Sequence, residues 1–321
     1  MDYAHRETDR IIRRLERKLR REFAKAGEEV REKLEKYLAD FAVKDAQKAK
    51  LVADGLMTES QYSAWRYGQI MIGKRWKEMQ DTLTEDYLHA AEHARSIAHG
   101  EAMDVYALNH NYATYQVEAT TGIDTSYTLY SHSTVARLVK ESPKLLPELG
   151  FSDAKAMRWY RQKISSVMTQ SILQGESIPK VASRMQEVTG MSYRASVRQA
   201  RTAMTAAQNA GRVDAYERAE EEYGIKGEKM WVATLDNRTR HSHIELDGEC
   251  VPFDATFPNG CRYPADPECD DPSEVYNCRC TLMEQIKGFE KDPHDMSWRN
   301  TRKLNGISYE DWKKGKKAKK K

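Results

Sequence analysis

The sequence has no long hydrophobic run and few helix-breaking residues. No window of its 321 residues approaches the ~18 consecutive apolar residues of a membrane-spanning helix, and the N-terminal MDYAHRETDR carries acids where a signal peptide has an apolar segment. We therefore expect neither a membrane span nor a secretory signal. Only 9 prolines occur, while 40% of the residues are hydrophobic and 31% are charged. This composition favours helices with an extensive polar surface.

Two phosphate-binding signatures are also absent from the sequence. It contains no GxxxxGK[ST] motif, and no GxGxxG motif follows a predicted strand. The glycines of these motifs let the backbone approach a nucleotide's phosphates closely. The sequence therefore gives no support for a nucleotide-driven motor or for a dinucleotide-dependent oxidoreductase.

The charges are distributed unevenly, although the formal net charge is only +3. The segment 245–274 holds nine acids and one basic residue, Arg262. The C-terminus is instead rich in lysine, namely Lys313, Lys314, Lys316, Lys317, Lys319, Lys320 and Lys321. Such a tail can bind double-stranded DNA weakly and without sequence preference, but it is also typical of a solvated chain end, which is the favoured interpretation.

Helical periodicity dominates the first 120 residues. From Ile12 to Phe41 the apolar residues recur every three or four positions, which predicts one long helix with an apolar stripe. Thr58 and Gln61 have the spacing of a capping box that opens a second helix, and Thr84 is a candidate cap further on. An apolar stripe needs a partner helix, either from this chain or from a second copy, so self-association through these N-terminal helices is expected.

The pattern after residue 120 predicts a mixed region. Residues 120–131 indicate a short strand or an extended crossing, and helices are predicted near 134–140, 152–175 and 179–188, with Gly190 as a stop before a long helix at 192–223. A strand is predicted at 230–236. The expected fold class is α+β and predominantly helical, with long N-terminal amphipathic helices followed by a compact module of helices and a small sheet.

All five cysteines lie within 31 residues and follow two histidines closely. Thiolates and imidazoles at this density can close a tetrahedral zinc site, and a cytosolic context favours metal over disulfide. The candidate ligands are His243, Cys250, Cys278 and Cys280, with Cys261 and Cys269 as alternates. The spacing is irregular and no CxxC pair is present, so buried or incidental thiols without metal are the favoured interpretation.

A second interpretation of this region is catalytic. Carboxylates and arginines surround His243, which could act as the general base of a zinc-dependent nuclease or toxin-like enzyme. The structural interpretation is favoured, because His243 can bond a backbone carbonyl, Asp247-Gly248 is a turn signature, and Arg238 and Arg240 can pair with nearby acids. No catalytic residue is therefore assigned.

The stretch from WVATLD to NCRC resembles the C-terminal domain of the phage minor head protein, or head morphogenesis, family, which is named after protein F of phage Mu. The resemblance covers roughly residues 165–285 and follows several motifs in order. Met204 stands where this family usually has an acid. The matching positions that we take as site residues are Trp231, Asp236, Arg240, His243, Asp247, Gly248, Phe257, Pro264, Asn277 and Arg279.

The resemblance implies a non-enzymatic minor capsid protein that acts in head morphogenesis at the portal vertex of the virion, after assembly in the host cytoplasm. It implies a portal protein and a major capsid or scaffolding protein as partners, and contact with packaged or ejected DNA. Some relatives fuse this module to toxin or ADP-ribosylating domains, for which the 39 residues after Leu282 are too few. We expect a portal- or capsid-association region at 1–150, the family module at 151–285 and a lysine-rich extension at 286–321, with structural zinc as the candidate cofactor.

Overall fold

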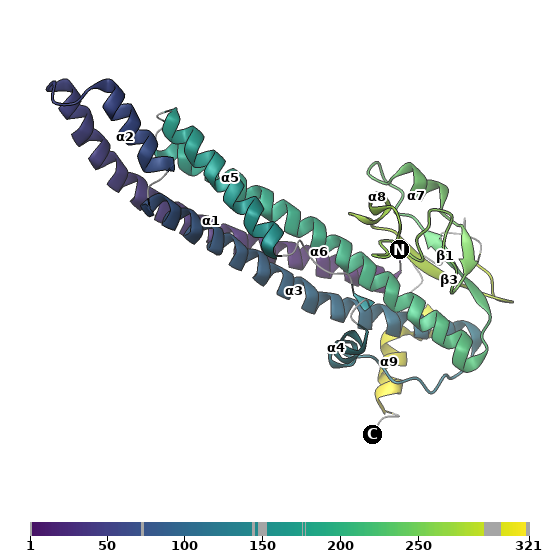
Figure 1. Ribbon diagram of the computed structural model, residues 1–321. Coiled ribbons are helices and arrows are strands. Elements are labelled where there is room, and N and C mark those ends of the chain that lie inside the picture. The colour runs from purple at the N-terminus through teal and green to yellow at the C-terminus, as the bar shows by residue number, and fades with distance from the viewer. Residues whose placement is uncertain are drawn as a thin grey trace. The chain divides into compact units, whose positions relative to one another are not determined.

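The computed structural model describes residues 2–71, 74–142, 145–146, 153–174, 176, 178–291 and 303–318. These residues form a predominantly helical α+β structure with a small antiparallel sheet, which confirms the expected fold class (Figure 1). No helix in the described part of the chain is both long enough and apolar enough to span a membrane. The helices are α1 (Tyr3–Ala53), α2 (Glu59–Met71), α3 (Lys74–Thr121), α4 (His132–Glu141), α5 (Asp153–Leu173), α6 (Ile178–Tyr223), α7 (His241–Glu245), α8 (Pro272–Val275) and α9 (Tyr309–Ala318). The strands are β1 (Gly227–Val232), β2 (Cys250–Pro252), β3 (Thr281–Ile286), β4 (Lys303–Leu304) and β5 (Ile307–Ser308).

Local sequence signals set some helix boundaries but not all. The predicted capping box precedes α2: the Thr58 amide donates to Gln61 Oε1 at 2.9 Å, and the Gln61 amide donates to Thr58 Oγ1 at 3.2 Å. The predicted cap at Thr84 is wrong, because Thr84 lies inside α3 and its hydroxyl donates to the Gln80 carbonyl at 2.7 Å.

The predicted helix stop at Gly190 is also wrong, since α6 runs without a break from Ile178 to Tyr223. A glycine inside a helix costs about 1 kcal/mol relative to alanine. Val188, which precedes this glycine, is 1% exposed within a large hydrophobic cluster, so the helix on that side is held in place by its packing. Tertiary packing thus outweighs the local preference of the glycine.

The chain divides into two compact units that are discontinuous in sequence. One comprises Met1–Glu16, Ser96–Leu149 and Arg198–Lys321, and the other comprises Arg17–Arg95 and Gly150–Val197. Parts of α1, α3 and α6 belong to each unit. The division expected from the sequence, at residues 150 and 285, stays a prediction about the modules of the family.

The unit that comprises Arg17–Arg95 and Gly150–Val197 is a helical bundle. The stripe of α1 continues here through Val30, Leu34 and Leu38, which are at most 6% exposed and pack against apolar side chains of α3, α5 and α6. The stripe therefore finds its partner helices within this chain, which is one of the two possibilities that the periodicity left open. Self-association of the N-terminal helices remains a prediction that requires other faces.

The other unit places the small sheet beside α6. Its strands lie in the order β2-β1-β3, with all pairs antiparallel and with Trp231 opposite Leu282. In this unit α3 and α6 approach closely at Gly211, where an added Cβ atom would lie 2.6 Å from the Tyr106 carbonyl oxygen. Only glycine fits there without a backbone shift, and the close approach brings the polar side chains of both helices into one buried layer.

A buried ion pair ties the N-terminus to α6 and β3. Asp2 Oδ2 and Oδ1 lie 2.8 and 2.9 Å from the two terminal nitrogens of Arg212, and the guanidinium also donates to the Leu282 carbonyl at 2.7 Å. The side chain of Arg212 is fully buried and that of Asp2 is 6% exposed. Burial opposes ionisation of the carboxyl, but the Arg212 guanidinium outweighs burial and lowers the pKa of Asp2 to about 2.

We expect this pair to make stability depend on acidity. Because the pKa of Asp2 is lower in the folded chain than its ordinary 3.8, its contribution is complete above about pH 4 and is lost as the pH falls toward 2. The loss should be about 2 kcal/mol in the free energy of unfolding. Urea unfolding at a series of pH values measures it, with Asp2→Asn as the comparison. Equal pH dependence in the two proteins would contradict the assignment.

Candidate functional site

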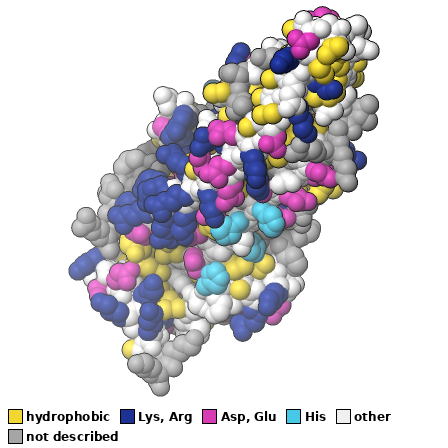
Figure 2. All heavy atoms as spheres, turned by 90° about the vertical axis from the view of Figure 1, so that its left-hand side faces the viewer, with side chains coloured by type: hydrophobic (Ala, Val, Ile, Leu, Met, Phe, Trp, Pro, Cys, Tyr) yellow, Lys and Arg dark blue, Asp and Glu magenta, His cyan; other side chains and the backbone are white. Residues whose placement is uncertain are grey.

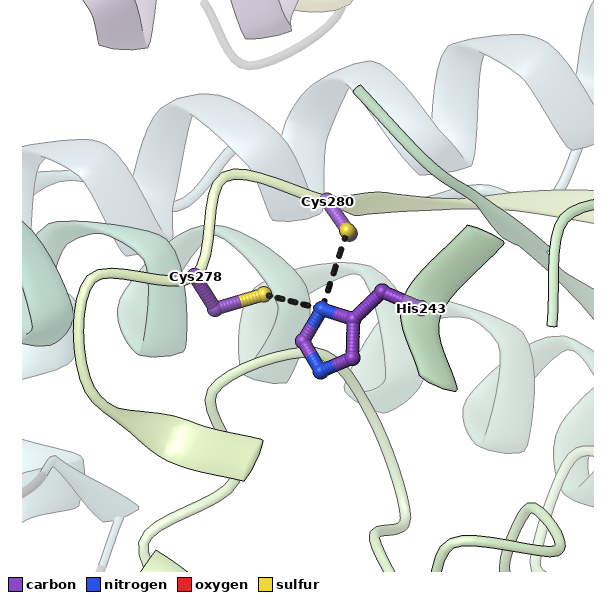
Figure 3. A group of neighbouring side chains, drawn as sticks. All are labelled: His243, Cys278 and Cys280. Atoms are coloured by element: carbon purple, nitrogen blue, oxygen red, sulfur yellow. Dashed lines mark hydrogen bonds between the residues drawn. The ribbon is translucent and has the colours of Figure 1, made fainter. Parts of the chain in front are cut away.

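Three potential metal ligands converge in the unit that contains the sheet. Figure 3 shows His243 of α7 facing Cys278 and Cys280, which lie on the loop that leads into β3. The Nδ1 atom of His243 is 3.6 Å from Sγ of Cys278 and 3.4 Å from Sγ of Cys280. All three ligand atoms lie within 4.8 Å of one another, and all three residues are buried.

Side chains of α6 hold this loop in place. Asn277 has a φ of 55°, and its amide donates to Thr202 Oγ1 at 3.0 Å. The Thr205 hydroxyl donates to the carbonyl of Cys278 at 2.8 Å, and Asn209 Nδ2 donates to the carbonyl of Cys280 at 3.2 Å. These hydrogen bonds fix the backbone of the loop, on which both thiols lie close to His243.

The other side of the imidazole faces a carboxylate. Nε2 of His243 lies 3.0 Å from Oε2 of Glu274. The Glu274 carboxylate accepts hydrogen bonds from Ser242 Oγ at 3.0 Å and from Asn259 Nδ2 at 3.2 Å. A carboxylate beside Nε2 favours the tautomer that carries the proton on that nitrogen. The lone pair of Nδ1 is then directed at the two thiols.

The two thiols differ in acidity. A hydrogen bond from the Cys278 thiol, together with the neighbouring His243, lowers the pKa of Cys280 to about 5, although burial opposes this change. Burial, and then the interaction with Cys280, raise the pKa of Cys278 well above its usual value. The surroundings thus shift the acidities of the two neighbouring thiols in opposite directions.

The structure separates the other predicted ligands from this cluster. Cys250 lies on β2, and its thiol donates to the Gly248 carbonyl at 3.5 Å. The alternates Cys261 and Cys269 form a disulfide bond, which corrects the expectation that these thiols serve a metal. The turn between them brings their Cα atoms to 4.6 Å, so the two sulfur atoms meet each other instead of His243.

The predicted family-motif residues serve the architecture of this site. Trp231 is fully buried and meets the rings of His243 and Phe257 edge-on, at centroid distances of 5.2 and 5.0 Å. Asp236 accepts two hydrogen bonds from Arg279, at 2.6 and 2.7 Å, which together with further bonds hold the pKa of its carboxyl well below the usual range. The motif thus supplies an aromatic wall, formed by Trp231 packed against His243 and Phe257, and an ion pair between Asp236 and Arg279.

The remaining motif residues fix the backbone around that wall. Asp247 Oδ1 accepts from the Ala233 amide at 2.8 Å, and Gly248, with a φ of 89°, donates its amide to the Trp231 carbonyl at 2.9 Å. Arg240 donates to the Tyr276 carbonyl. The Pro264 carbonyl accepts from Asn209 of α6 at 3.0 Å. All of these contacts are hydrogen bonds that involve the backbone, so these residues stabilise the local fold.

The nuclease interpretation needs His243 to reach a phosphodiester. The side chain of His243 is only 2% exposed, and its two ring nitrogens face the thiols and Glu274. A general base must come within hydrogen-bonding distance of the proton that it removes. The geometry therefore favours a structural role for His243 over a catalytic one.

The lysine-rich end has more structure than the sequence suggested. Lys316 belongs to α9, is 7% exposed, and pairs with Asp124 at 2.9 Å and with Glu118 at 2.6 Å. Lys314 lies 3.8 Å from Asp311. Lys313, Lys316 and Lys317 line a cavity of about 880 Å³ beside residues 126–132. Lys319, Lys320 and Lys321 lie outside the described residues.

Two features of the site gave no recognisable signal in the sequence. Glu274 lies 31 positions after His243 and among many other acids, so spacing did not single it out. The pairing of Asp2 with Arg212 joins residues 210 positions apart. Both contacts depend on the tertiary fold, which brings together segments that lie apart in the sequence. Local patterns do not encode such contacts.

Comparisons with known proteins show which proteins this chain is similar to. Residues 162–283 match the family model described as Phage Mu protein F like protein. The chain is 29% identical over 224 residues to the minor head protein GP7 of Bacillus phage SPP1, an alignment that covers 66% of this chain and 70% of that protein. These findings support a phage minor head protein family for this chain, as the motif resemblance indicated.

Other relatives are longer than the shared region. The chain is 30% identical over 204 residues to NAD(+)–arginine ADP-ribosyltransferase EFV of Enterococcus faecalis, an alignment that covers 62% of this chain and 40% of that protein. It is 29% identical over 199 residues to an uncharacterized protein of Haemophilus influenzae, with the same 62% and 40% coverage. The chain thus spans less than half the length of these two relatives. No solved structure matches the chain.

Proposed function

We propose that this chain acts in head assembly of a tailed phage or prophage, as a non-enzymatic minor capsid protein at the portal vertex. The observation that carries the proposal is the alignment with the SPP1 minor head protein, which extends well beyond the family module and covers 70% of that protein. Its location would be the virion, with the host cytoplasm as the place of assembly. A portal protein and a major capsid or scaffolding protein are the proposed partners.

The absence of catalysis is part of the proposal. The relative that is named as an ADP-ribosyltransferase aligns over 40% of its length, so more than half of it lies outside the shared region. In the present chain the family-motif side chains make packing contacts and backbone hydrogen bonds. The buried His243 has the contacts of a structural residue, and this favours assembly over chemistry.

Portal binding can be tested with the full chain. The portal protein encoded by the same genome is mixed with this protein, and the complex is measured by analytical ultracentrifugation, with a major tail protein of that genome as the negative control. We expect the chain to co-sediment with the portal protein and not with the major tail protein. Sedimentation of the two proteins as separate species over a range of salt concentrations would contradict portal association.

Contact with double-stranded DNA is the second part of the proposal. Figure 2 shows a face on which Lys and Arg side chains form a dense group beside acidic side chains. A test of DNA binding must therefore distinguish the lysines of α9 from the other basic residues of the chain. Lys313, Lys314 and Lys317 lie on α9, and two of them line the cavity beside residues 126–132. Lys316 is committed to its ion pairs and should be left intact.

Replacing Lys313, Lys314 and Lys317 with Gln should weaken DNA binding and its dependence on salt. Each lost phosphate contact reduces the slope of log K against log salt by about 0.9, so up to about 2.7 is expected. Fluorescence anisotropy with a random-sequence duplex measures the slope. A variant with Lys36, Lys44 and Lys50 of α1 changed to Gln loses the same charge and is the control. Equal slopes in the two variants would remove α9 from the DNA contact.

A further inference from the structure

We propose that His243, Cys278 and Cys280 bind one zinc ion, through Nδ1 of the imidazole and the two Sγ atoms. The ligand set is narrower than the one that the cysteine density suggested, because Cys250 is remote and Cys261 is bonded to Cys269. Among the described residues, no fourth potential ligand joins this group. The proposal concerns the family module itself and does not depend on portal binding.

The two nitrogen–sulfur distances in this group fit zinc. A Zn–N bond of about 2.0–2.1 Å and a Zn–S bond of about 2.3 Å, at a tetrahedral angle, place nitrogen and sulfur about 3.6 Å apart. The observed Nδ1–Sγ separations are 3.6 Å and 3.4 Å. A zinc ion therefore fits between these atoms with little movement of the side chains (Figure 3).

The chemistry of the donors points to the same ion. Two thiolates and one neutral imidazole suit a borderline-soft divalent cation, and they do not suit magnesium or calcium, which take oxygen ligands. Two thiolate charges compensate the charge of Zn²⁺, so the buried site becomes neutral on binding.

The surroundings of the imidazole supply the outer layer of such a site. Zinc-bound histidines donate their second ring N–H to a carboxylate or carbonyl, which fixes the tautomer and the ring orientation. Glu274 Oε2 is 3.0 Å from Nε2 and is itself held by Ser242 and Asn259. Glu274 is therefore a positioning residue for the metal ligand.

Zinc at this point would connect three parts of the module. It would join α7 to the loop of Cys278 and Cys280, and that loop is fastened to α6 by Thr205 and Asn209. The segment between β1 and β3 consists largely of loops, with the short helices α7 and α8 and the short strand β2. A metal that binds only the folded state would stabilise their arrangement by mass action.

Metal content and spectroscopy test the proposal on the full chain. The protein is produced in zinc-supplemented medium, purified under conditions that leave the disulfide intact, and analysed for bound metal. We expect about one zinc per chain in the wild type and in Cys250→Ser, and less than a tenth of that in the double variant Cys278→Ser, Cys280→Ser. Glu274→Gln should keep the fold and bind zinc about 10- to 100-fold more weakly.

Cobalt substitution keeps the test decisive even if the double variant does not fold. In wild-type protein, Co²⁺ should give thiolate-to-metal charge-transfer bands and the visible bands of a tetrahedral site, and added zinc should abolish both. A folded wild-type chain that takes up neither zinc nor cobalt would overturn the proposal. So would zinc that persists in a folded double variant, or X-ray absorption that shows only oxygen and nitrogen ligands.

Discussion

Replacing Arg212 with Met is expected to lower the free energy of unfolding by about 3–5 kcal/mol, because it leaves a buried carboxylate without its partner. Arg212 is fully buried, and its guanidinium joins Asp2 at the N-terminus, Asn109 of α3 and the Leu282 carbonyl of β3. Methionine fills similar space but offers no donor to any of these groups. The loss should appear as a lower urea midpoint by circular dichroism.

A double variant separates the charge from the packing. Arg212→Met combined with Asp2→Asn removes the unpaired charge, so it should be more stable than Arg212→Met alone. An ion pair on the surface, such as Lys226 with Glu220, serves as the comparison, since exposed pairs contribute about 0–1 kcal/mol. A loss in the free energy of unfolding below about 1 kcal/mol for Arg212→Met would show that the buried pair contributes no more than an exposed one.

The second large effect is expected at Trp231, where substitution by Ala should cost about 3–5 kcal/mol. Its side chain is fully buried on β1 and packs edge-on against His243 and Phe257. Removal of the indole leaves a cavity and deprives the His243 ring of the wall that orients it. The unfolding of the family module should therefore shift to lower temperature and lower denaturant concentration.

Trp231→Phe is the matched variant for this prediction. Phenylalanine keeps an aromatic ring against His243 and Phe257, so the expected loss is clearly smaller than that of alanine. Differential scanning calorimetry of the three proteins gives the ranking. Equal stability of Trp231→Ala and the wild type would mean that this wall does not support the module.

The helices could be predicted from sequence because their signals are local. The stripe from Leu15 to Leu38 has helical spacing, and its residues are buried as that spacing implies. The capping box at Thr58 and Gln61 also depends on neighbouring residues alone. The predicted stop at Gly190 failed because the packing of distant helices decides whether a glycine ends a helix.

The candidate site could be predicted only in part. His243, Cys278 and Cys280 were among the proposed ligands, because their residue types and density suggest a metal. Spacing could not show that Cys250 lies outside the cluster or that Cys261 bonds to Cys269, since both depend on turns in a segment without periodicity. The role of Glu274 required the folded arrangement of α7 and α8.

The function proposed here is tested most directly by the protein content of assembled heads. Particles from the phage or prophage that encodes the chain are purified on a density gradient, with and without a functional portal gene, and the chain is quantified by mass spectrometry against the major capsid protein. We expect a few copies per particle in normal heads and a strong reduction in heads without the portal. Absence of the chain from intact, portal-containing heads and procapsids would contradict the proposal that it is a minor head protein.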